Sequence, residues 1–570
     1  NRASDDAAGL SIASGLEADS RVYNQALRNV NDSLSALSIV DGALSELSEI
    51  LTRQLELAEQ AANGTVSNRQ RYALDDEYKA LTKEFNRIVS TTKFNDIAFL
   101  RDANTELNVQ AGYKEAGLTQ ITIGDELART VGDGTFKDST AYGNAFYAFD
   151  SGDFNGDGLL DLVGAGSNTG VFLGDGQGNY TLSDTDSGTG NPGGVVISGD
   201  FNGDGSLDIA TYSAQGGAHL DIFDVSAEGQ LTLLQSVSSI SGINPTLAVG
   251  DINNDNIDDV LYTSTSDGIH FLLGSSTGLH EAGKLPGNTT TNDFALADMN
   301  RDGYSDVLFF DLGYISLSYN NGDGTFSDSQ RLFNTSLGES AEIHASDLNQ
   351  DGLLDIAVQG FYEGVEIYFQ QPDNSYSQVF SVSGDYDSMK LDDINGDGIG
   401  DISIAGNDGV AIYLNDQHGN FNQTFTSAAS VQRGHAILDF DNDGAMDLVT
   451  SSGPGLNIFI ANTMEVNTIA LDSILTQREA REALDVGREA LDRLSKERGS
   501  IGASMTRLLT QASQLATQRD MFHEARSRIE DTDIAEDSAE AVRSKILQQS
   551  AAKVLQVANL QPTIALELLG

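Results

Sequence analysis

Residues 153–161 read Asp-Phe-Asn-Gly-Asp-Gly-Leu-Leu-Asp, and this acidic nine-residue pattern occurs seven times in the chain. The copies are named here loops 1 to 7 and span residues 153–161, 200–208, 251–259, 298–306, 347–355, 393–401 and 439–447. Successive copies begin 47, 51, 47, 49, 46 and 46 residues apart. One acidic turn with glycine would be a weak signal, whereas seven at nearly constant spacing indicate a repeat architecture.

Side-chain oxygens occupy the same positions in every loop. Positions 1, 5 and 9 are Asp, position 3 is Asn or Asp, and position 6 is Gly except for Asn256. Ca²⁺ takes six to eight oxygen ligands at about 2.3–2.6 Å, and a tight loop with a permissive residue at position 6 brings positions 1, 3, 5 and 9 and the carbonyl of position 7 together. The pattern predicts up to seven structural calcium sites. Their candidate ligands are Asp153, Asn155, Asp157, Asp161, Asp200, Asn202, Asp204, Asp208, Asp251, Asn253, Asp255, Asp259, Asp298, Asn300, Asp302, Asp306, Asp347, Asn349, Asp351, Asp355, Asp393, Asn395, Asp397, Asp401, Asp439, Asp441, Asp443 and Asp447.

A second interpretation of the loops stays open, because the same residues also form Asx-type turns without a metal. Clustered carboxylates repel one another when no cation lies between them, so a metal-free loop needs hydrogen bonds in its place. Loop 3 is the least typical copy, with Asn256 at position 6 and an additional Asp258.

The segments after the loops have the composition of β-strands. A short apolar run, such as residues 306–310, commonly follows the loop, and then a run that opens on Gly, such as residues 268–273 or 364–369. Their alternation and their β-branched and aromatic content favour strands. Several strands in each repeat of about 47 residues are typical of a propeller blade. We therefore expect an all-β, seven-bladed propeller over residues 131–461.

The ring is expected to close through the segment that precedes loop 1. Residues 132–136 (Gly-Asp-Gly-Thr-Phe) match residues 322–326 inside the array, while the last repeat ends at residue 460 without such a tail. The N-terminal piece should therefore supply the outer strand of the final blade.

Both ends of the chain have the pattern of long amphipathic helices. Between Ser20 and Ala62 there is no proline, and a second helix is expected from about Asn68 to Val89. Apolar residues fall on a heptad-like stripe in the N-terminal helix, at Val30, Leu34, Leu37, Leu44, Leu51, Leu55, Ala58 and Ala62. The C-terminal segment has a matching stripe from Leu484 to Phe522 and a later one from Leu547 to Ala558. Such stripes predict a long α-helical coiled bundle of both termini, either with or without a role in assembly.

Several motifs lie at the two ends of the chain, namely residues 1–10 (Asn-Arg-Ala-Ser-Asp-Asp-Ala-Ala-Gly-Leu), 57–65, 91–95, 525–533, 546–549 and 558–570. Together these motifs resemble bacterial flagellins. The motifs occur in the family's order, over roughly residues 1–130 and 465–570. The family has a further helix before the first motif, so the chain looks like an N-terminally truncated fragment that polymerises poorly by itself.

The resemblance implies a structural subunit of the extracellular flagellar filament, secreted and self-assembling through its terminal helices for motility. The implied partners are other flagellin subunits and the flagellar export and cap machinery. The implied domains are an N-terminal helical core at 1–130, the propeller as a variable outer domain at 131–461, a C-terminal core helix at 462–534, and a terminal-domain helix at 535–570.

One short segment also matches the positions through which flagellins are sensed by a vertebrate Toll-like receptor. These candidate contacts are Arg53, Glu56, Leu57 and Gln60. The alternative is that they are solvated or packing residues of the helix.

The repeats of residues 131–461 resemble the FG-GAP/VCBS family, similar to the calcium-bearing propellers of integrin α subunits. This resemblance implies structural calcium in the acidic loops. It also leaves open an adhesin, in which the propeller binds a glycan or a host surface.

Composition limits the other classes of function. The net charge is −53, from 85 acidic and 32 basic residues, which argues against binding to nucleic acid or insertion into an anionic membrane. There is no Cys, and the seven His are scattered without a zinc-protease or nucleophile motif, so we expect no enzyme. Six of the 32 basic residues lie between 131 and 461, so the composition itself separates the middle from the ends.

Overall fold

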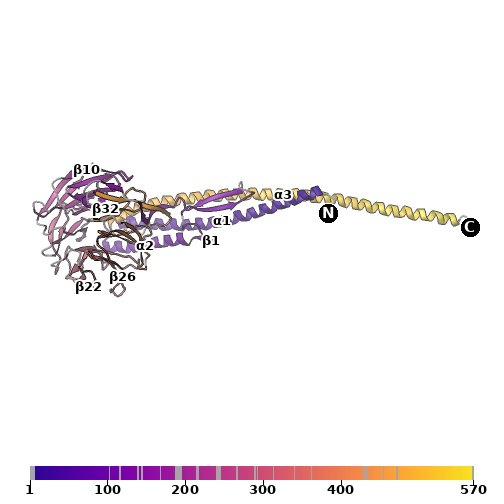
Figure 1. Ribbon diagram of the computed structural model, residues 1–570. Helices are drawn as coiled ribbons and strands as arrows, with labels where there is room; N and C mark the ends of the chain where they lie inside the picture. Colours follow the sequence, from indigo (N-terminus) through magenta and orange to yellow (C-terminus); the bar gives the residue numbers. More distant parts are fainter. Residues whose placement is uncertain are drawn as a thin grey trace. The chain divides into compact units, whose positions relative to one another are not determined.

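The computed structural model divides into two compact units (Figure 1). One unit comprises Asn1–Glu46, Thr92–Glu126 and Arg493–Gly570, and the other comprises Leu47–Thr91 and Leu127–Asp492. The structure describes residues 7–101, 103–113, 117–137, 140–142, 146–166, 168–186, 195–213, 217–238, 240, 245–264, 268–287, 291, 293–311, 313–338, 340–360, 362–416, 418–427, 431, 434–452, 455–469 and 473–567.

Within the described ranges, three helices form the α-helical part: α1 (Ala7–Ala61), α2 (Asn68–Thr91) and α3 (Gln477–Glu567). Helix α1 begins 13 residues before the predicted Ser20, because the segment from Ala7 is rich in strong helix formers and contains no proline. Helix α3 continues through residues 534 and 535, where the sequence analysis placed a domain boundary, and that division stays a prediction. Among the described residues, no helix is both long enough and apolar enough to cross a membrane.

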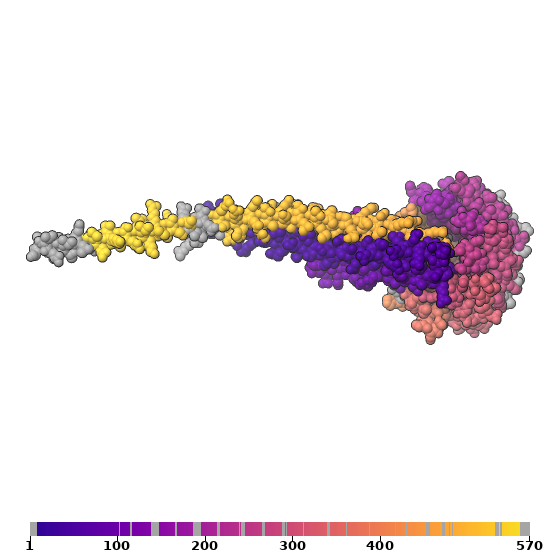
Figure 2. Space-filling model, turned by 180° about the vertical axis from the view of Figure 1, so that it is seen from behind, coloured from indigo at the N-terminus to yellow at the C-terminus, as the bar shows by residue number. Residues whose placement is uncertain are grey.

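The first unit is held together by the predicted apolar stripes. Leu37 and Leu44 of α1 and Ile501 and Leu508 of α3 are each fully buried. Each such side chain contributes about 1.5–3 kcal/mol relative to exposure. The two helices lie side by side in Figures 1 and 2.

Shorter elements complete this unit. They are the hairpins β1 (Lys93–Phe94) with β2 (Ile97–Ala98) and β3 (Thr105–Gln110) with β4 (Leu118–Ile123). Buried Glu497 of α3 accepts hydrogen bonds from the amides of Gly124 (2.9 Å) and Glu126 (3.2 Å). The carboxylate thereby pairs amides that would otherwise be buried without a partner.

In the second unit, the described residues form seven four-stranded antiparallel sheets, which are the blades of the propeller. Blades 1 to 3 are β7 (Phe146–Gly152), β8 (Asp161–Gly166), β9 (Thr169–Gly174), β10 (Tyr180–Asp186); β11 (Val195–Gly199), β12 (Asp208–Ser213), β13 (His219–Val225), β14 (Leu231–Ser238); and β15 (Leu247–Gly250), β16 (Asp259–Ser264), β17 (Gly268–Leu273), β18 (His280–Lys284).

Blades 4 to 7 are β19 (Phe294–Ala297), β20 (Asp306–Asp311), β21 (Tyr314–Ser318), β22 (Gln330–Asn334); β23 (Ser340–Ser346), β24 (Asp355–Gly360), β25 (Gly364–Gln370), β26 (Tyr376–Val382); β27 (Tyr386–Asp392), β28 (Asp401–Gly406), β29 (Gly409–Asn415), β30 (Phe421–Ser427); and β31 (His435–Leu438), β32 (Asp447–Ser452), β33 (Gly455–Phe459), β6 (Thr140–Tyr142). The predicted number of blades is confirmed.

The ring closes as the repeat pattern predicts, with one difference in register. The N-terminal piece does supply the fourth strand of blade 7, but that strand is β6, four residues after the matched segment 132–136. Residues 132–136 lie instead in β5 (Arg129–Phe136), which pairs with β34 (Ala461–Val466). Blade 4 explains the offset, because its fourth strand β22 likewise begins four residues after segment 322–326.

The hydrophobic core of the propeller lies between neighbouring blades. The second strands are buried along their whole length, as in Asp208–Ser213 and Asp355–Gly360, while the fourth strands alternate between half-buried and exposed residues. The second strand lies between the first and the third strand of its sheet, where neighbouring blades cover both of its faces. The propeller thereby offers a rigid support for the loops that join its strands.

Candidate functional site

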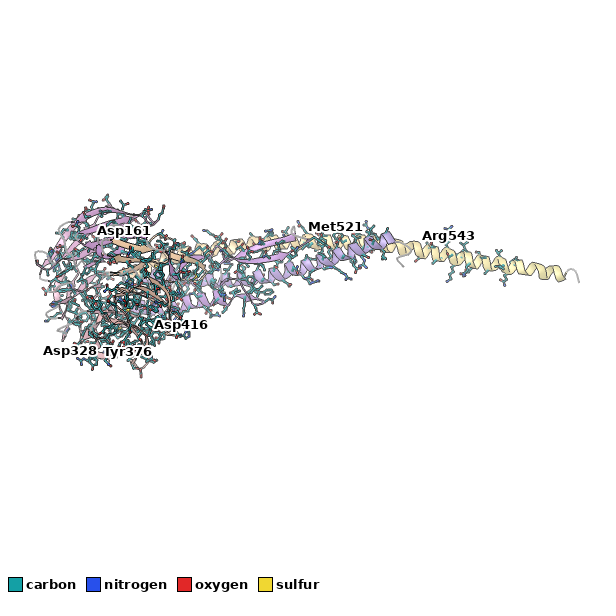
Figure 3. The ribbon with its side chains drawn as sticks, viewed as in Figure 1. Asp161, Asp328, Tyr376, Asp416, Met521 and Arg543 are labelled. Atoms are coloured by element: carbon teal, nitrogen blue, oxygen red, sulfur yellow. The ribbon has the colours of Figure 1, made fainter. Side chains whose placement is uncertain are left out.

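All seven acidic loops connect the first and the second strand of their blade, so they lie at the same end of the strands. The first strand ends at the residue before position 1 or close to it, and the second strand begins at position 9. Asp161, the position 9 residue of loop 1, is labelled in Figure 3. The blades thus hold the predicted ligands of each loop together, and the repeat places seven similar loops on one face of the propeller.

The backbone of each loop turns through two left-handed residues. Position 6 has a positive φ in every loop, from 64° at Asn256 to 94° at Gly303, as the glycine pattern predicts. Position 4 also has a positive φ, between 56° and 75°. No sequence pattern predicts this conformation at position 4, because the residue there is Gly in three loops but Arg301 in loop 4 and Gln350 in loop 5.

The side chain at position 1 closes each turn. In loop 5, the Asp347 carboxylate accepts hydrogen bonds from the amides of Asp351 (3.0 Å) and Gly352 (2.9 Å). The Asp351 carboxylate in turn accepts from the amide of Leu353 (2.8 Å). The same three hydrogen bonds recur in the other six loops. The loops are therefore preformed, which the Asx-turn interpretation and the calcium interpretation both require.

The aspartate at position 9 is fully buried in each of the seven loops. In loop 5, Asp355 Oδ2 accepts from the amide of Leu348 (3.0 Å) and Oδ1 from the amide of Gln370 (2.9 Å). The carboxylate therefore ties the start of its loop to the end of the third strand of the blade. Both oxygens keep a second lone pair, so this role is compatible with metal ligation.

The electrostatics of the loops favour either a proton or a cation. Burial raises the pKa of the position 9 carboxyl to about 7 in five loops, namely at Asp208, Asp259, Asp306, Asp355 and Asp447. Burial raises the pKa of Asp401 in the same way, to about 8. Backbone hydrogen bonds oppose this rise, while the other carboxylates of the loop add to it. A bound cation would remove this repulsion and favour the charged form.

Loop 7 allows the most direct test of whether the residues fit calcium. One oxygen each of Asp439, Asp441 and Asp447 lie within 4.8 Å of one another. Two oxygens that bind the same Ca²⁺ are at most about 5 Å apart, so this spacing fits one shared ion. In addition, Asp441 Oδ1 is buried without a hydrogen-bond partner among the residues that the structure describes. The donor set therefore suits a hard divalent cation, and the seven predicted sites remain predictions.

The four predicted receptor contacts lie on α1 and differ in exposure. Arg53 pairs with Glu56 (2.9 Å) and with Glu77 of α2 (2.8 Å), and Gln60 is exposed. Leu57 is fully buried, in a cluster with Tyr78 and other residues of the second unit. Leu57 is therefore a core residue in this conformation, and the receptor prediction stays untested for all four residues.

Comparison with protein families gives three matches. Residues 1–105 match the bacterial flagellin N-terminal helical region, and residues 484–569 match the bacterial flagellin C-terminal helical region. The FG-GAP-like repeat matches residues 153–211, 251–309, 298–358 and 393–450. These matches contain all seven loops in full.

Curated relatives are similar to this chain over its flagellin-like part. Flagellin A of Vibrio anguillarum is 43% identical over 130 residues, which are 22% of this chain and 34% of that protein. The flagellin of Halalkalibacterium halodurans is 39% identical over 123 residues, 22% of this chain and 45% of that protein. The chain thus spans less than half the length of these relatives.

Two solved structures are similar over the propeller region. One is an Agrocybe aegerita lectin described as recognising non-reducing terminal N-acetylglucosamine, with 17% identity and a TM-score of 0.40 over 57% of this chain and 96% of that chain. The other is BBS1N in complex with ARL6DN, with 13% identity and a TM-score of 0.42 over 59% of this chain and 99% of that chain. Neither similarity is high enough to bear on function.

Proposed function

Because this chain carries the N- and C-terminal helical regions of bacterial flagellins around FG-GAP-like repeats, we propose that it is a structural subunit of the flagellar filament. In this proposal the terminal helices assemble with those of other subunits outside the cell, and the propeller is a calcium-stabilised domain displayed on the filament. The flagellin family is structural rather than enzymatic. Contacts with the export and cap machinery follow from the same proposal.

An exposed apolar stripe on the last part of α3 carries the proposal. Large hydrophobic side chains there are 58–68% exposed, at Val542, Ile546, Leu547, Val554, Leu555 and Val557. Figure 3 shows side chains standing free of this helix around Arg543. A continuous apolar patch of this kind marks an interaction surface, and a helix presents it best to another helix. The family match indicates the partner of this stripe, which is helix α3 of another subunit.

Assembly onto existing filaments tests the proposal. Fluorescently labelled chain is mixed with sheared flagellar filament seeds, and the fraction that sediments with the seeds is measured. We expect Leu547→Asp with Val554→Asp to lower the sedimented fraction at least fivefold, because a charge in an apolar helix interface is left unpaired. The matched control is Ala552→Asp, because Ala552 is exposed and lies on the face of α3 away from these apolar side chains, and it should leave sedimentation unchanged.

Sedimentation that is equal for the stripe variant and the control would reject this surface as an assembly surface. Circular dichroism of each variant confirms that α3 stays helical. A glycan-binding role of the propeller remains the alternative prediction, and a glycan array probed with the whole chain addresses it.

A further inference from the structure

The seven loops are not covered equally, although they have nearly the same sequence. Glycines at position 6 show the difference. A Cβ added to Gly303 of loop 4 would lie 2.7 Å from the amide nitrogen of Arg69 and 2.8 Å from Cβ of Asn68, at the start of α2. A Cβ added to Gly158 of loop 1 or Gly205 of loop 2 would meet no described atom within 4 Å. Helix α2 therefore packs directly on loop 4, whereas the same position is open in loops 1 and 2.

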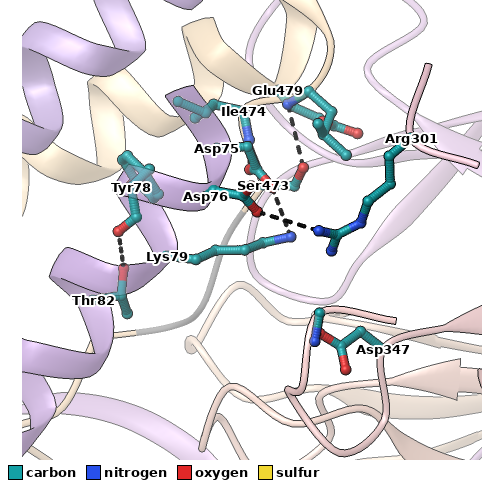
Figure 4. Close-up of polar contacts among 12 residues, drawn as sticks. Asp75, Asp76, Tyr78, Lys79, Thr82, Arg301, Asp347, Ser473, Ile474 and Glu479 are labelled. Carbon is teal, nitrogen blue, oxygen red and sulfur yellow. Dashed lines mark hydrogen bonds and ion pairs between the residues drawn. The ribbon is translucent and has the colours of Figure 1, made fainter. Parts of the chain in front are cut away.

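Polar contacts between α2 and the loops extend along the helix. Asn68 Nδ2 donates to the carbonyl of Gly303 in loop 4 (2.9 Å), and about four turns later Lys83 Nζ donates to the carbonyl of Gln350 in loop 5 (2.9 Å). Between them, Asp76 faces Arg301 of loop 4 at 4.0 Å, as the dashed line in Figure 4 shows. Figure 4 also shows Asp347, the first residue of loop 5, in the same region.

Loop 3 belongs to the same surface. Gln477 Nε2, at the start of α3, donates to Oδ1 of Asn256 in loop 3 (3.0 Å). Arg71 of α2 interacts electrostatically with Asp251, the first residue of that loop. Loops 3, 4 and 5 are named here the docking loops, and loops 1 and 2 the open loops.

Backbone strain is concentrated in two of the docking loops. Arg301 (φ 59°) and Gln350 (φ 57°) occupy position 4 in the left-handed region, where long side chains are rare. The open loops have Gly156 and Gly203 at this position. Such strain persists where the surrounding structure enforces it. Here the two strained residues are the ones that contact Asp76 and Lys83 of α2.

The helix and a metal would use mostly different groups of the same loop, and the exception is the side chain of Asp298 in loop 4, which forms a hydrogen bond with Tyr72 of α2. Helix α2 binds the carbonyls of positions 4 and 6, through Gln350 and Gly303. The calcium pattern uses side chains at positions 1, 3, 5 and 9 and the carbonyl of position 7. One loop conformation can therefore bind the helix and the metal at the same time. Binding of either one stabilises that conformation and so favours binding of the other.

We propose that the docking loops form a calcium-dependent joint, in which metal bound to loops 3, 4 and 5 holds helix α2 on the propeller. This inference rests on the calcium sites of the proposed function. Without the ion, repulsion among the carboxylates loosens the loops and moves the carbonyls that α2 binds. The coupling is reciprocal, so docking of α2 raises the calcium affinity of these three loops by the same factor.

Hydrogen exchange of α2 in the full chain tests the joint. Amides of residues 68–91 are followed by mass spectrometry in millimolar calcium and in excess chelator. In the unmodified chain we expect calcium to slow exchange of α2 by about tenfold, within the usual range of such couplings. Asp302→Asn with Asp351→Asn, at position 5 of loops 4 and 5, should remove most of this difference.

The matched control carries the same change in the open loops, Asp157→Asn with Asp204→Asn. It should keep the calcium effect on α2, because these loops do not support the helix. Equal loss in both double variants would overturn the joint and favour general destabilisation of the propeller. Loss in the docking-loop variant alone supports it.

A second comparison changes the helix and leaves every loop intact. Lys83→Ala removes the contact with loop 5, and Arg87→Ala removes a positive charge that pairs with Glu84 of the same helix. Calorimetric titration with calcium should show weaker binding at a subset of sites for Lys83→Ala and unchanged binding for Arg87→Ala. Equal titrations for the two variants would contradict the reciprocity.

The exchange experiment also separates this inference from the calcium proposal itself. If calcium changes exchange neither in α2 nor in the second strands of the blades, the loops bind no metal and the calcium proposal fails. If calcium protects the blades but leaves α2 unchanged, the sites are real and only the joint is rejected.

Discussion

At the scale of single residues, the aspartate at position 9 does more than the ligand pattern predicts. Sequence spacing assigned it to calcium because a ninth-position oxygen can reach an ion held by positions 1, 3 and 5. In the structure it also joins two segments of its blade through buried hydrogen bonds, as Asp355 does with Leu348 and Gln370. This role depends on where the third strand ends, and the residue spacing within the loop does not predict that position.

We therefore expect Asp355→Asn to destabilise the propeller even when no calcium is present. The amide group cannot accept both hydrogen bonds, and leaving a buried backbone amide unpaired costs about 1–3 kcal/mol. Chemical unfolding in chelator measures the loss. The control is Asp351→Asn, whose new amide oxygen can still accept from Leu353. We expect Asp351→Asn to be less stable than the unmodified chain only when calcium is added. Equal losses of stability for both variants in chelator would contradict the structural role of Asp355.

A second residue-scale effect concerns His435 in the first strand of blade 7. Its ring nitrogens meet Ser403 Oγ (2.8 Å) and Ser388 Oγ (3.0 Å). Burial lowers the pKa of His435 to about 3. The unfolded chain takes up this proton near pH 6.5, so between pH 6.5 and 3 the unfolded state binds more protons. The contribution of neutral His435 to stability is therefore complete above pH 6.5 and is lost as the pH falls toward 3.

Comparison with His435→Asn isolates this contribution from the carboxylates that titrate in the same range. At pH 7 we expect the unmodified chain to be the more stable one, because Asn cannot bond both serines. As the pH falls, the difference in free energy of unfolding should shrink by at most about 1.4 kcal/mol for each pH unit below 6.5. Denaturant titrations at pH 7, 6, 5 and 4 measure it, and a constant difference would show that the pKa of His435 is the same in the folded and the unfolded chain.

At the scale of elements, nearly identical loops acquire different surroundings from helix α2. The sequence has glycine at position 6 in six loops, and the left-handed turn explains the choice of glycine equally in all six. Only the structure shows that Gly303 has a second reason, because the first residues of α2 leave no room for a side chain. The contacts that create this difference join residues more than 200 positions apart, such as Asn68 and Gly303.

Two alanine substitutions separate these reasons. Gly303→Ala and Gly158→Ala both place a Cβ at a positive φ, 94° and 84°, so both carry the strain of the turn. Only Gly303→Ala also pushes against α2. We expect it to lower the free energy of unfolding by about 1–3 kcal/mol more than Gly158→Ala, in the range of overpacking. Equal effects would mean that α2 yields without cost, which would also weaken the proposed joint.

At the scale of the whole molecule, calcium should distinguish the propeller from the helices. A ligand that binds only the folded state stabilises it by mass action, by about 2.7 kcal/mol at 100 times the dissociation constant. We expect thermal unfolding to show a transition of the propeller that falls under chelation. A second transition, of the helices of the first unit, should stay in place. Differential scanning calorimetry of the full chain in both conditions measures this.

Chelation that moves no transition would show that the seven loops are turns held by their own hydrogen bonds. The flagellin-like helical regions would be unaffected by that result, because they rest on the stripes of α1 and α3 and on the family matches. A single transition that moves as a whole would instead show that the two units unfold together.

The sequence by itself determined the number of blades, the position of each acidic loop, and the two helical ends. These features follow from local periodicity: a nine-residue pattern repeated seven times, and apolar residues at helical spacing. Ring closure was also predictable, because residues 132–136 copy residues 322–326, although the strand itself begins four residues later.

Tertiary structure alone decided the second role of position 9 and the difference between docking and open loops. In each case the deciding partner is distant in sequence: the end of a third strand for Asp355, and helix α2 for Gln350 and Gly303. A repeat pattern assigns the same environment to every copy. Packing against an element that occurs once in the chain breaks that equivalence, and so only the folded molecule distinguishes one loop from another.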